Sequence, residues 1–286
     1  MPTAAPATFA GLLESAVNDP GILSTAYRAF HDFSLGNMLL GYSQCLARGI
    51  QPGPMATFQR WHELGRHVRR GEKALVLCRP VTVKRAATSE DDADEAVFTR
   101  FVYTPRWFVL SQTDGEPVPE PPMPSWDKDR ALAALRIQEV PFDMLDGNTL
   151  GVARARSIAI NPTNPLPWKT RFHECAHILH GHTGDGVEQR DGEMTPRNLR
   201  EVEAETVALL ACAVLELPGV EFARGYIQNW WGHGNAIPER SAQKILKVAD
   251  QVLKAGTKTL FAPAGECDNA VRIDGARTPL EDTANT

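Results

Sequence analysis

The stretch FHECAHILHGH, at residues 172–182, constrains the fold more than any other feature of this 286-residue sequence. His173, Glu174 and His177 follow the pattern H-E-x-x-H, and residues four apart lie one above the other on the same face of an α-helix. Neither proline nor glycine interrupts the pattern, and its neighbours are mostly apolar. The stretch therefore predicts a helix that packs against a core and presents two imidazoles on one face.

Two imidazoles at this spacing can hold one metal ion, and the glutamate between them can act as general base on water, as in zincin metallopeptidases. We therefore interpret His173 and His177 as metal ligands and Glu174 as the catalytic base. Because the pattern is short, the simplest alternative is a buried helix in which the histidines occur by chance. A second alternative is a ligand triple that adds His180. Otherwise, His180 and His182 are predicted to shape the end of the helix.

A catalytic zinc site usually has three protein ligands, and the third is predicted in TPRNLREVEAETVALLACAVLEL, residues 195–217. Thr195 and Pro196 are typical of a helix start, and an apolar stripe follows them. Glu201 and Glu205 are four apart and share a face of this helix, so one can bind the metal while the other orients a ligand histidine. The alternative role of these acidic residues is compensation of the helix dipole.

Composition excludes several classes of protein. No apolar run is long enough to span a membrane, and the N-terminal MPTAAPATFAGLLESAV lacks the basic start of a secretory signal. The five cysteines are scattered and form no C-x-x-C pair, as is typical of reduced thiols in the cytosol. We therefore expect a cytoplasmic protein with no membrane partner.

The segment DGEPVPEPPMPSW, residues 114–126, contains five prolines and few side chains that can pack. It predicts an interdomain linker between a first domain at 1–113 and a second domain at 127–262. Helical periodicity and strand-like runs occur in both parts, so both domains are predicted to be α+β. The polar tail at 263–286 is predicted to be disordered.

A basic segment lies in the first half of the chain. The net charge is −5, but residues 60–85 carry eight basic and only two acidic side chains. Basic groups that follow phosphates, beside aromatic rings that stack on bases, are typical of single-strand binding. The alternative is that the aromatic rings belong to the core and the basic turn is ordinary surface. The candidate DNA-binding residues are Trp61, Arg66, Arg69, Arg70 and Lys73, with Phe101, Tyr103 and Trp107 as aromatic neighbours.

Several stretches resemble a known family. SLGNMLLGYSQCLARG, TFQRWHELGRHVRRGEKALVLCRPV and RWFVLSQTDGEP resemble the N-terminal domain of ArdC-type antirestriction proteins. Two runs in combination make this resemblance specific. They are W-x-x-L-G-x-x-V-R-x-G-E-K from Trp61 to Lys73 and F-x-x-x-Q-T from Phe108 to Thr113. In the second half, HECAH, REVEAETVA and RGYIQNW resemble the zinc metallopeptidase domain fused to it, which is similar to ImmA/IrrE-type peptidases.

The resemblance implies an α+β domain that binds single-stranded DNA, followed by a zincin-like metallopeptidase domain with helices on a small antiparallel sheet. It favours Glu201 as the third metal ligand and Glu205 as the residue that orients a ligand histidine. The implied cofactor is zinc, or another divalent cation, and the implied partners are single-stranded DNA and an unknown protein substrate. The implied function is antirestriction: a plasmid or other mobile element protects its incoming single-stranded DNA.

Two other functions stay open. The chain can be a regulatory metalloprotease that cleaves a DNA-bound repressor or another DNA-associated protein, or a DNA-binding protein whose metal is only structural. Within the second domain, SIAI at 157–160 is predicted to offer a strand edge to an extended peptide. Tyr226 is a candidate for stabilising an oxyanion, and its alternative is an ordinary core tyrosine.

Overall fold

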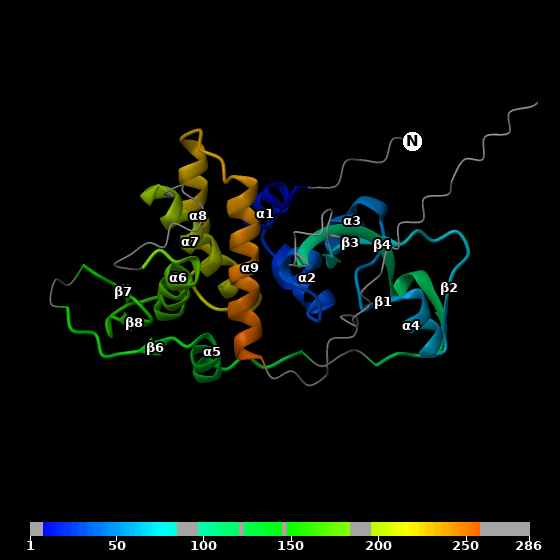
Figure 1. Cartoon of the computed structure of the whole chain (residues 1–286), viewed down its shortest axis with the longest axis horizontal. Helices are drawn as coiled ribbons and strands as arrows, with labels where there is room; N and C mark the ends of the chain where they lie inside the picture. Colours follow the sequence, from blue (N-terminus) through cyan, green and yellow to red (C-terminus); the bar gives the residue numbers. More distant parts are fainter. Residues whose placement is uncertain (1–7, 85–96, 120–122, 145–147, 184–195, 258–286) are drawn as a thin grey trace, which may run out of the picture.

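The computed structural model describes residues 8–84, 97–119, 123–144, 148–183 and 196–257. Within these ranges the chain is α+β, with helices and three small sheets (Figure 1), so the predicted fold class is confirmed. Two predictions, the disordered tail at 263–286 and the helix cap at Thr195, lie outside the described residues.

The N-terminal half places three helices before two small sheets. β1, β4 and β3 form an antiparallel sheet in the order β1-β4-β3, and β2 pairs with β5, also antiparallel. Together they match the helical and strand-like runs read in the sequence. The elements are α1 (Phe9–Asn18), α2 (Ile22–Phe30), α3 (Leu35–Arg48), β1 (Met55–Thr57), α4 (Phe58–Glu63), β2 (Arg66–Val68), β3 (Leu75–Lys84), β4 (Val97–Val109), a 3₁₀ turn (Leu110–Gln112) and β5 (Thr113–Gly115).

The described part of the C-terminal half contains α5 to α9 and one small sheet, which packs against α6 and α5. Its strand order is β6-β8-β7, with β7 antiparallel and β6 parallel to β8. SIAI is therefore the central strand, and the prediction that its edge is open to a peptide was wrong: β7 is the edge strand next to α6. The elements are α5 (Lys128–Leu135), β6 (Gln138–Glu139), β7 (Gly151–Arg154), β8 (Ser157–Ile160), α6 (Pro167–His180), α7 (Arg197–Val214), α8 (Val220–Gly232) and α9 (Glu239–Gly256).

Local sequence explains the bounds of α6. Pro167 occupies its first turn, where a missing N–H costs nothing. Gly181 ends the helix in the left-handed conformation, with φ of 77°, which glycine adopts without a steric penalty. The face with Phe172, Cys175 and Ala176 is buried, and α6 packs against α7, as the apolar neighbours of H-E-x-x-H predict.

The two halves share one hydrophobic core. Helix α9 runs between them, with α1 and α3 on one side and α5, α6 and α7 on the other (Figure 1). One cluster of buried side chains contains Leu13 and Leu35 from the first half together with Leu209 and Leu246 from the second. The division into two domains joined by a linker therefore stays a prediction, and the described halves pack closely on each other.

Polar contacts also join the halves at helix ends. The Glu239 carboxylate at the start of α9 accepts hydrogen bonds from the backbone N–H groups of Phe9 and Ala10, at 3.0 and 2.9 Å. The Asp250 carboxylate accepts from the N–H of Leu35 at 3.1 Å. These carboxylates cap α1 and α3, whose first N–H groups have no partner within their own helix. They orient the helices of the first half relative to α9.

None of the described helices is both long enough and apolar enough to cross a membrane.

Candidate metal centre

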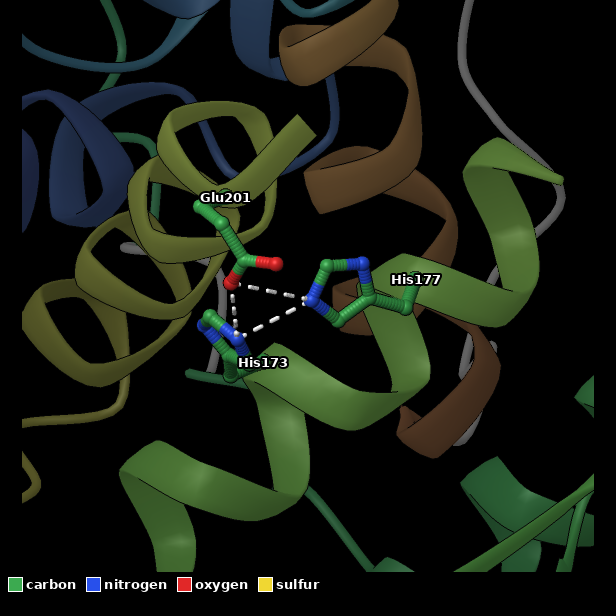
Figure 2. Close-up of side chains that lie close together, drawn as sticks. All are labelled: His173, His177 and Glu201. Carbon is green, nitrogen blue, oxygen red and sulfur yellow. Dashed lines mark hydrogen bonds and ion pairs between the residues drawn. The ribbon is translucent and has the colours of Figure 1, made fainter. Parts of the chain in front are cut away.

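Three donor atoms meet between α6 and α7. The Nε2 atoms of His173 and His177 lie 3.0 Å apart, and Glu201 Oε2 lies 3.5 Å from the first and 3.6 Å from the second. Figure 2 shows both rings pointing from α6 toward the Glu201 carboxylate on α7. The structure thus brings together the two histidines and the glutamate that were predicted as ligands.

Two edges of this triangle, the 3.5 and 3.6 Å from Glu201 to the histidines, fit one divalent ion, and the 3.0 Å between the two Nε2 atoms is slightly shorter than the usual separation. Zinc bound tetrahedrally at about 2.0–2.2 Å from nitrogen and oxygen ligands holds those ligands roughly 3.3–3.6 Å apart. The donor set of two imidazoles and one carboxylate suits zinc and other first-row divalent metals. Three protein donors leave a fourth position for water or substrate, which is the arrangement of catalytic zinc sites.

Glu205 and Lys169 support His173 from outside the triangle. Glu205 is buried, and its Oε2 lies 2.9 Å from Nδ1 of His173. Its other oxygen forms an ion pair of 2.7 Å with Lys169 Nζ, whose ammonium also lies 4.8 Å from the centre of the Phe222 ring. A carboxylate on the second nitrogen of a ligand histidine fixes its tautomer and ring orientation. Glu205 thus has the geometry of the orienting residue, and Glu201 that of the ligand.

His177 has a corresponding partner on the loop after α6. Nδ1 of His177 lies 3.0 Å from Nδ1 of His182, and Nε2 of His182 lies 3.1 Å from Oε2 of the buried Glu203. The sequence predicted only that His182 shapes the end of the helix, but the structure also places it against a ligand histidine. Glu203 had no predicted role. No spacing in the sequence indicates this contact, because it depends on the left-handed turn at Gly181 and on the rotation of α7.

Glu174 lies in a tight space between α6 and β7. Its side chain is buried. A Cβ atom on Gly151, the first residue of β7, would lie 3.2 Å from Glu174 Cγ and 2.5 Å from Thr170 Cγ2. Glycine at 151 therefore allows β7 to approach α6 closely enough to hold the Glu174 side chain beside the sheet edge. No spacing or periodicity in the sequence predicts this role for Gly151.

The electrostatics of the cluster favour a cation. Burial alone would lower the pKa of His173, but hydrogen bonds to Glu201 and Glu205 outweigh it and raise that pKa to about 9. Hydrogen bonds from His173 and His177 hold the pKa of Glu201 far below its ordinary value. Burial raises the pKa of Glu174, as suits a group that accepts a proton near neutral pH. The carboxylates thus stabilise positive charge where the donor atoms meet.

Tyr226 lies on α8, near enough to Glu201 and Glu205 for their charges to act on its hydroxyl. Its side chain is 43% exposed, so it is not the core tyrosine of the alternative interpretation. Partial burial of the side chain raises the pKa of its hydroxyl, and the negative charges of Glu201 and Glu205 raise it further. A protonated phenol close to the metal ligands is available as a hydrogen-bond donor.

Trp61 belongs to the core. Its side chain is 1% exposed, and its indole N–H donates to the carbonyl of Phe108 at 2.8 Å. A ring in this position cannot stack on a base, so the structure corrects the stacking role and supports the alternative of a core tryptophan. On the surface of β4, Phe101 and Tyr103 are exposed instead.

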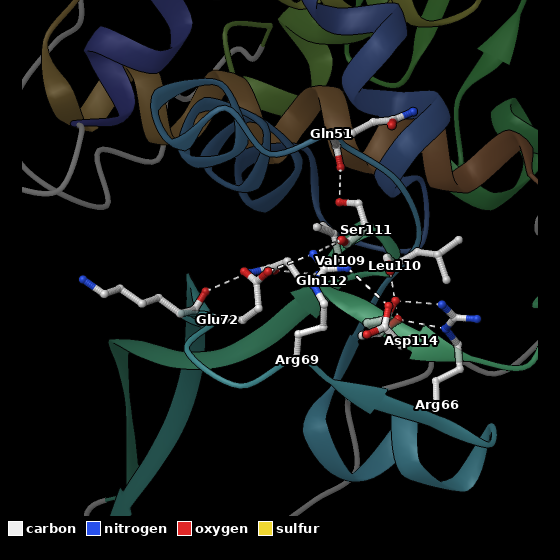
Figure 3. A network of polar contacts seen from close by, with 11 residues as sticks. Gln51, Arg66, Arg69, Glu72, Val109, Leu110, Ser111, Gln112 and Asp114 are labelled. Carbon is white, nitrogen blue, oxygen red and sulfur yellow. Dashed lines mark hydrogen bonds and ion pairs between the residues drawn. The ribbon is translucent and has the colours of Figure 1, made fainter.

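Two of the predicted DNA-binding arginines are held by the protein itself (Figure 3). Arg66 donates to Oγ1 and the carbonyl of Thr113 at 2.8 and 2.9 Å, and to the carbonyls of Gly115 and Glu116. Arg69 forms an ion pair with Glu72 at 2.8 Å. The other carboxylate oxygen of Glu72 accepts a hydrogen bond from Gln112. These arginines therefore fix the turn between β2 and β3 against the segment around β5.

Arg70 and Lys73, by contrast, point their side chains to solvent. Both residues are exposed, and within the described part of the chain neither side chain has a hydrogen bond or an ion pair. Their cationic groups are available to a phosphate without breaking an existing contact. The basic turn thus contains two supporting arginines and two available cations, a distinction that sequence spacing cannot make.

The fold and site define an α+β protein with a basic segment in its N-terminal half and an H-E-x-x-H centre completed by a glutamate. Residues 15–106 match the family model of the N-terminal domain of anti-restriction factor ArdC. Among solved structures, the chain is similar to antirestriction protein ArdC from the R388 plasmid, in its metal-free structure (TM-score 0.52) and its Mn(II)-bound structure (TM-score 0.50). Sequence identity is 17% in both comparisons, which cover 86% of this chain and 92% and 95% of the other.

Residues 15–106 thus match the ArdC N-terminal domain family, and the chain as a whole has a fold similar to that of ArdC. A comparison with curated proteins finds no match. The resemblance to the ImmA/IrrE-type peptidases stays a prediction.

Proposed function

We propose that this chain is an antirestriction protein that binds single-stranded DNA through its N-terminal half and carries a metallopeptidase centre in its C-terminal half. The ArdC domain at residues 15–106 supports the antirestriction role. The observation that supports the peptidase is the meeting of His173, His177 and Glu201 around one point, with the buried Glu174 on the same helix. A buried acid beside such donors is expected of a general base and is not required by a purely structural metal.

Zinc is the proposed ion, with manganese as its principal competitor. The relative from R388 has a Mn(II)-bound structure, while two imidazoles and one carboxylate are also a common catalytic zinc set. When bound, such an ion polarises a carbonyl group and makes water easier to deprotonate. His173, His177 and Glu201 would hold it, and Glu205 would keep the His173 ring in place.

The other residues would act on the peptide and its protons. Glu174 would take a proton from the attacking water and pass it to the leaving amine. The Tyr226 hydroxyl would donate a hydrogen bond to the oxygen of the scissile carbonyl as negative charge develops there. β7 would hold the substrate as an added strand, because it lies at the edge of its sheet and beside Glu174.

DNA would bind on the exposed part of the basic turn. Arg70 and Lys73 would contact phosphates, and the exposed rings of Phe101 and Tyr103 are the aromatic side chains available for stacking. We expect the affinity for a single-stranded oligonucleotide to fall steeply with salt, because bound counterions are released. Arg70→Ala together with Lys73→Ala should weaken binding and flatten this salt dependence.

A matched control removes two exposed lysines of α9, with Lys244→Ala and Lys247→Ala. The control should bind the oligonucleotide like the wild type, since these lysines lie on the other half of the chain. Equal binding by the wild type and the Arg70/Lys73 variant would remove the basic turn from the DNA surface. A preference for duplex DNA would contradict the single-strand assignment.

Two rival functions differ from this proposal in measurable ways. If the metal is only structural, DNA protection needs the first half and not the base. If the chain is a regulatory protease, it cleaves a repressor and does not protect DNA from restriction. The test compares wild type with Glu174→Ala and His177→Ala in metal content, peptide cleavage and DNA protection in cells.

Glu174→Ala should keep the metal and lose cleavage, whereas His177→Ala should lose both. Full DNA protection by Glu174→Ala would show that the peptidase is not needed for antirestriction. Wild type that binds no metal after reconstitution would contradict the metallopeptidase altogether.

A further inference from the structure

The two ligand histidines differ in what holds their outer nitrogen. In His173 that nitrogen contacts a carboxylate directly, whereas in His177 it contacts a second imidazole, that of His182. His182 in turn contacts Glu203. The side chains of His182 and Glu203 are only 8% and 4% exposed, so water competes little for these hydrogen bonds.

The positions of the protons follow from one condition. A histidine that binds a metal through Nε2 offers a lone pair there, so its neutral ring carries hydrogen on Nδ1. His177 must then donate from Nδ1 to Nδ1 of His182, which accepts. His182 consequently carries its own hydrogen on Nε2 and donates it to Glu203, which can only accept. Each donor thus meets an acceptor along this chain of contacts.

We propose that His182 and Glu203 are positioning residues, which hold His177 in the tautomer and ring orientation that metal binding requires. The proposal rests on the metal centre described above. It gives His177, through one intervening imidazole, the support that Glu205 gives His173 directly. Outer partners of this kind typically change metal affinity without touching the ion.

The turn that ends α6 explains how His182, which follows the helix, reaches back to His177 within it. Gly181 turns the chain through a left-handed conformation, and the backbone N–H of His182 then donates to the carbonyl of His177 at 2.8 Å. The N–H of Gly181 donates to the carbonyl of Ile178 at 3.1 Å, and these two bonds together form a Schellman turn. It folds the chain back, so that the His182 ring lies edge-on to the His177 ring, with 5.2 Å between centroids and 62° between the ring planes.

A second metal site is the main rival for the same side chains. Donor atoms of His180, His182 and Glu203 all lie within 4.8 Å of one another, and the buried Nε2 of His180 has no hydrogen-bond partner. A metal on Nε2 of His182 would force hydrogen onto its Nδ1. That nitrogen would then donate to His177, whose hydrogen would move to Nε2 and block the first site. With neutral rings, the two sites therefore exclude each other.

The experiment titrates Zn²⁺ alone into the purified, metal-free full chain against a competing chelator. His182→Ala should weaken zinc binding by about 10- to 100-fold. His182→Asn should recover much of that loss, because its amide oxygen can accept from His177 near the place of the lost nitrogen. Glu203→Gln should have a smaller effect, because its amide oxygen still accepts from His182. His180→Ala is the matched control and should bind one zinc like wild type.

Two further measurements distinguish a loss of positioning from a general loss of folding. Thermal unfolding of the metal-free variants shows whether each is folded, and the absorption spectrum of the Co²⁺-loaded protein reports ligand geometry. We expect the spectrum of His182→Ala to change and that of His180→Ala to stay the same. If folded His182→Ala binds zinc as tightly as wild type, the proposal is overturned.

Binding of two zinc ions by wild type, with one lost in His180→Ala, would overturn it in favour of the second site. Wild type that binds no zinc would instead refute the metal centre on which the proposal rests. If wild type binds zinc but the His182 variants do not weaken it, the centre stands and only the positioning role fails.

Discussion

At the scale of single residues, Trp61 shows how burial decides between two roles that the sequence leaves open. Trp61→Phe removes the indole N–H and leaves the Phe108 carbonyl without its donor. We expect a loss of about 1–3 kcal/mol in the free energy of unfolding, measured by urea denaturation. The folded variant should bind a single-stranded oligonucleotide like wild type. Lost DNA affinity with unchanged stability would restore the stacking role.

Gly151 makes a second prediction at this scale. A methyl group at 151 would overlap Thr170 and press on Glu174, so Gly151→Ala should destabilise the fold by about 1–3 kcal/mol. If Glu174 is the general base, its displacement should also reduce peptide cleavage more than metal binding. Gly225→Ala is the control, because its Cβ would meet no atom within 4 Å. Equal stability of the two variants would show that β7 does not need the close approach.

At the scale of elements, β6 is joined to α6 by a charged pair. Arg171 donates to both carboxylate oxygens of Glu139, at 2.7 and 3.0 Å. These hydrogen bonds, against the opposing effect of burial, hold the Glu139 pKa below its ordinary value of 4.5. The unfolded state thus binds the proton more tightly, so this stabilisation is present above that value and is lost as the pH falls through the folded pKa.

Glu139→Gln should therefore destabilise the protein by about 1.5–3 kcal/mol at pH 7. The difference from wild type should shrink below about pH 4.5. Urea denaturation across this pH range measures it. The control is Glu63→Gln in the exposed pair with Arg60, which should cost no more than about 1 kcal/mol. A difference that is constant with pH would show that the charge of Glu139 contributes nothing.

The elements also show what the sequence can and cannot predict. Helix α6 was predictable because its apolar face, its proline and its glycine act within a few residues of one another. Glu201 could be chosen as the ligand only from the family resemblance. Glu201 and Glu205 lie on the same face of the helix, so their positions in the sequence do not distinguish their roles. The central place of β8 was not predictable, because strand order depends on pairing between distant segments. The contact of His182 with Glu203 depends in the same way on how α7 packs against α6.

At the scale of the whole molecule, the proline-rich segment suggests two independent domains, whereas the packing of α9 joins the halves. Buried side chains of α1 and α3 belong to the same cluster as those of α7 and α9. We therefore expect the full chain to unfold in one cooperative transition, with coincident changes in circular dichroism and tryptophan fluorescence. Two well-separated transitions would show that the halves are independent domains.

The central claim is that one divalent ion binds between α6 and α7. Its most direct test is the anomalous-difference map of crystals grown with Zn²⁺ or Mn²⁺. The claim predicts a single strong peak about 2.0–2.2 Å from Nε2 of His173, Nε2 of His177 and a carboxylate oxygen of Glu201. A peak between His180, His182 and Glu203, or none at either place, would contradict it.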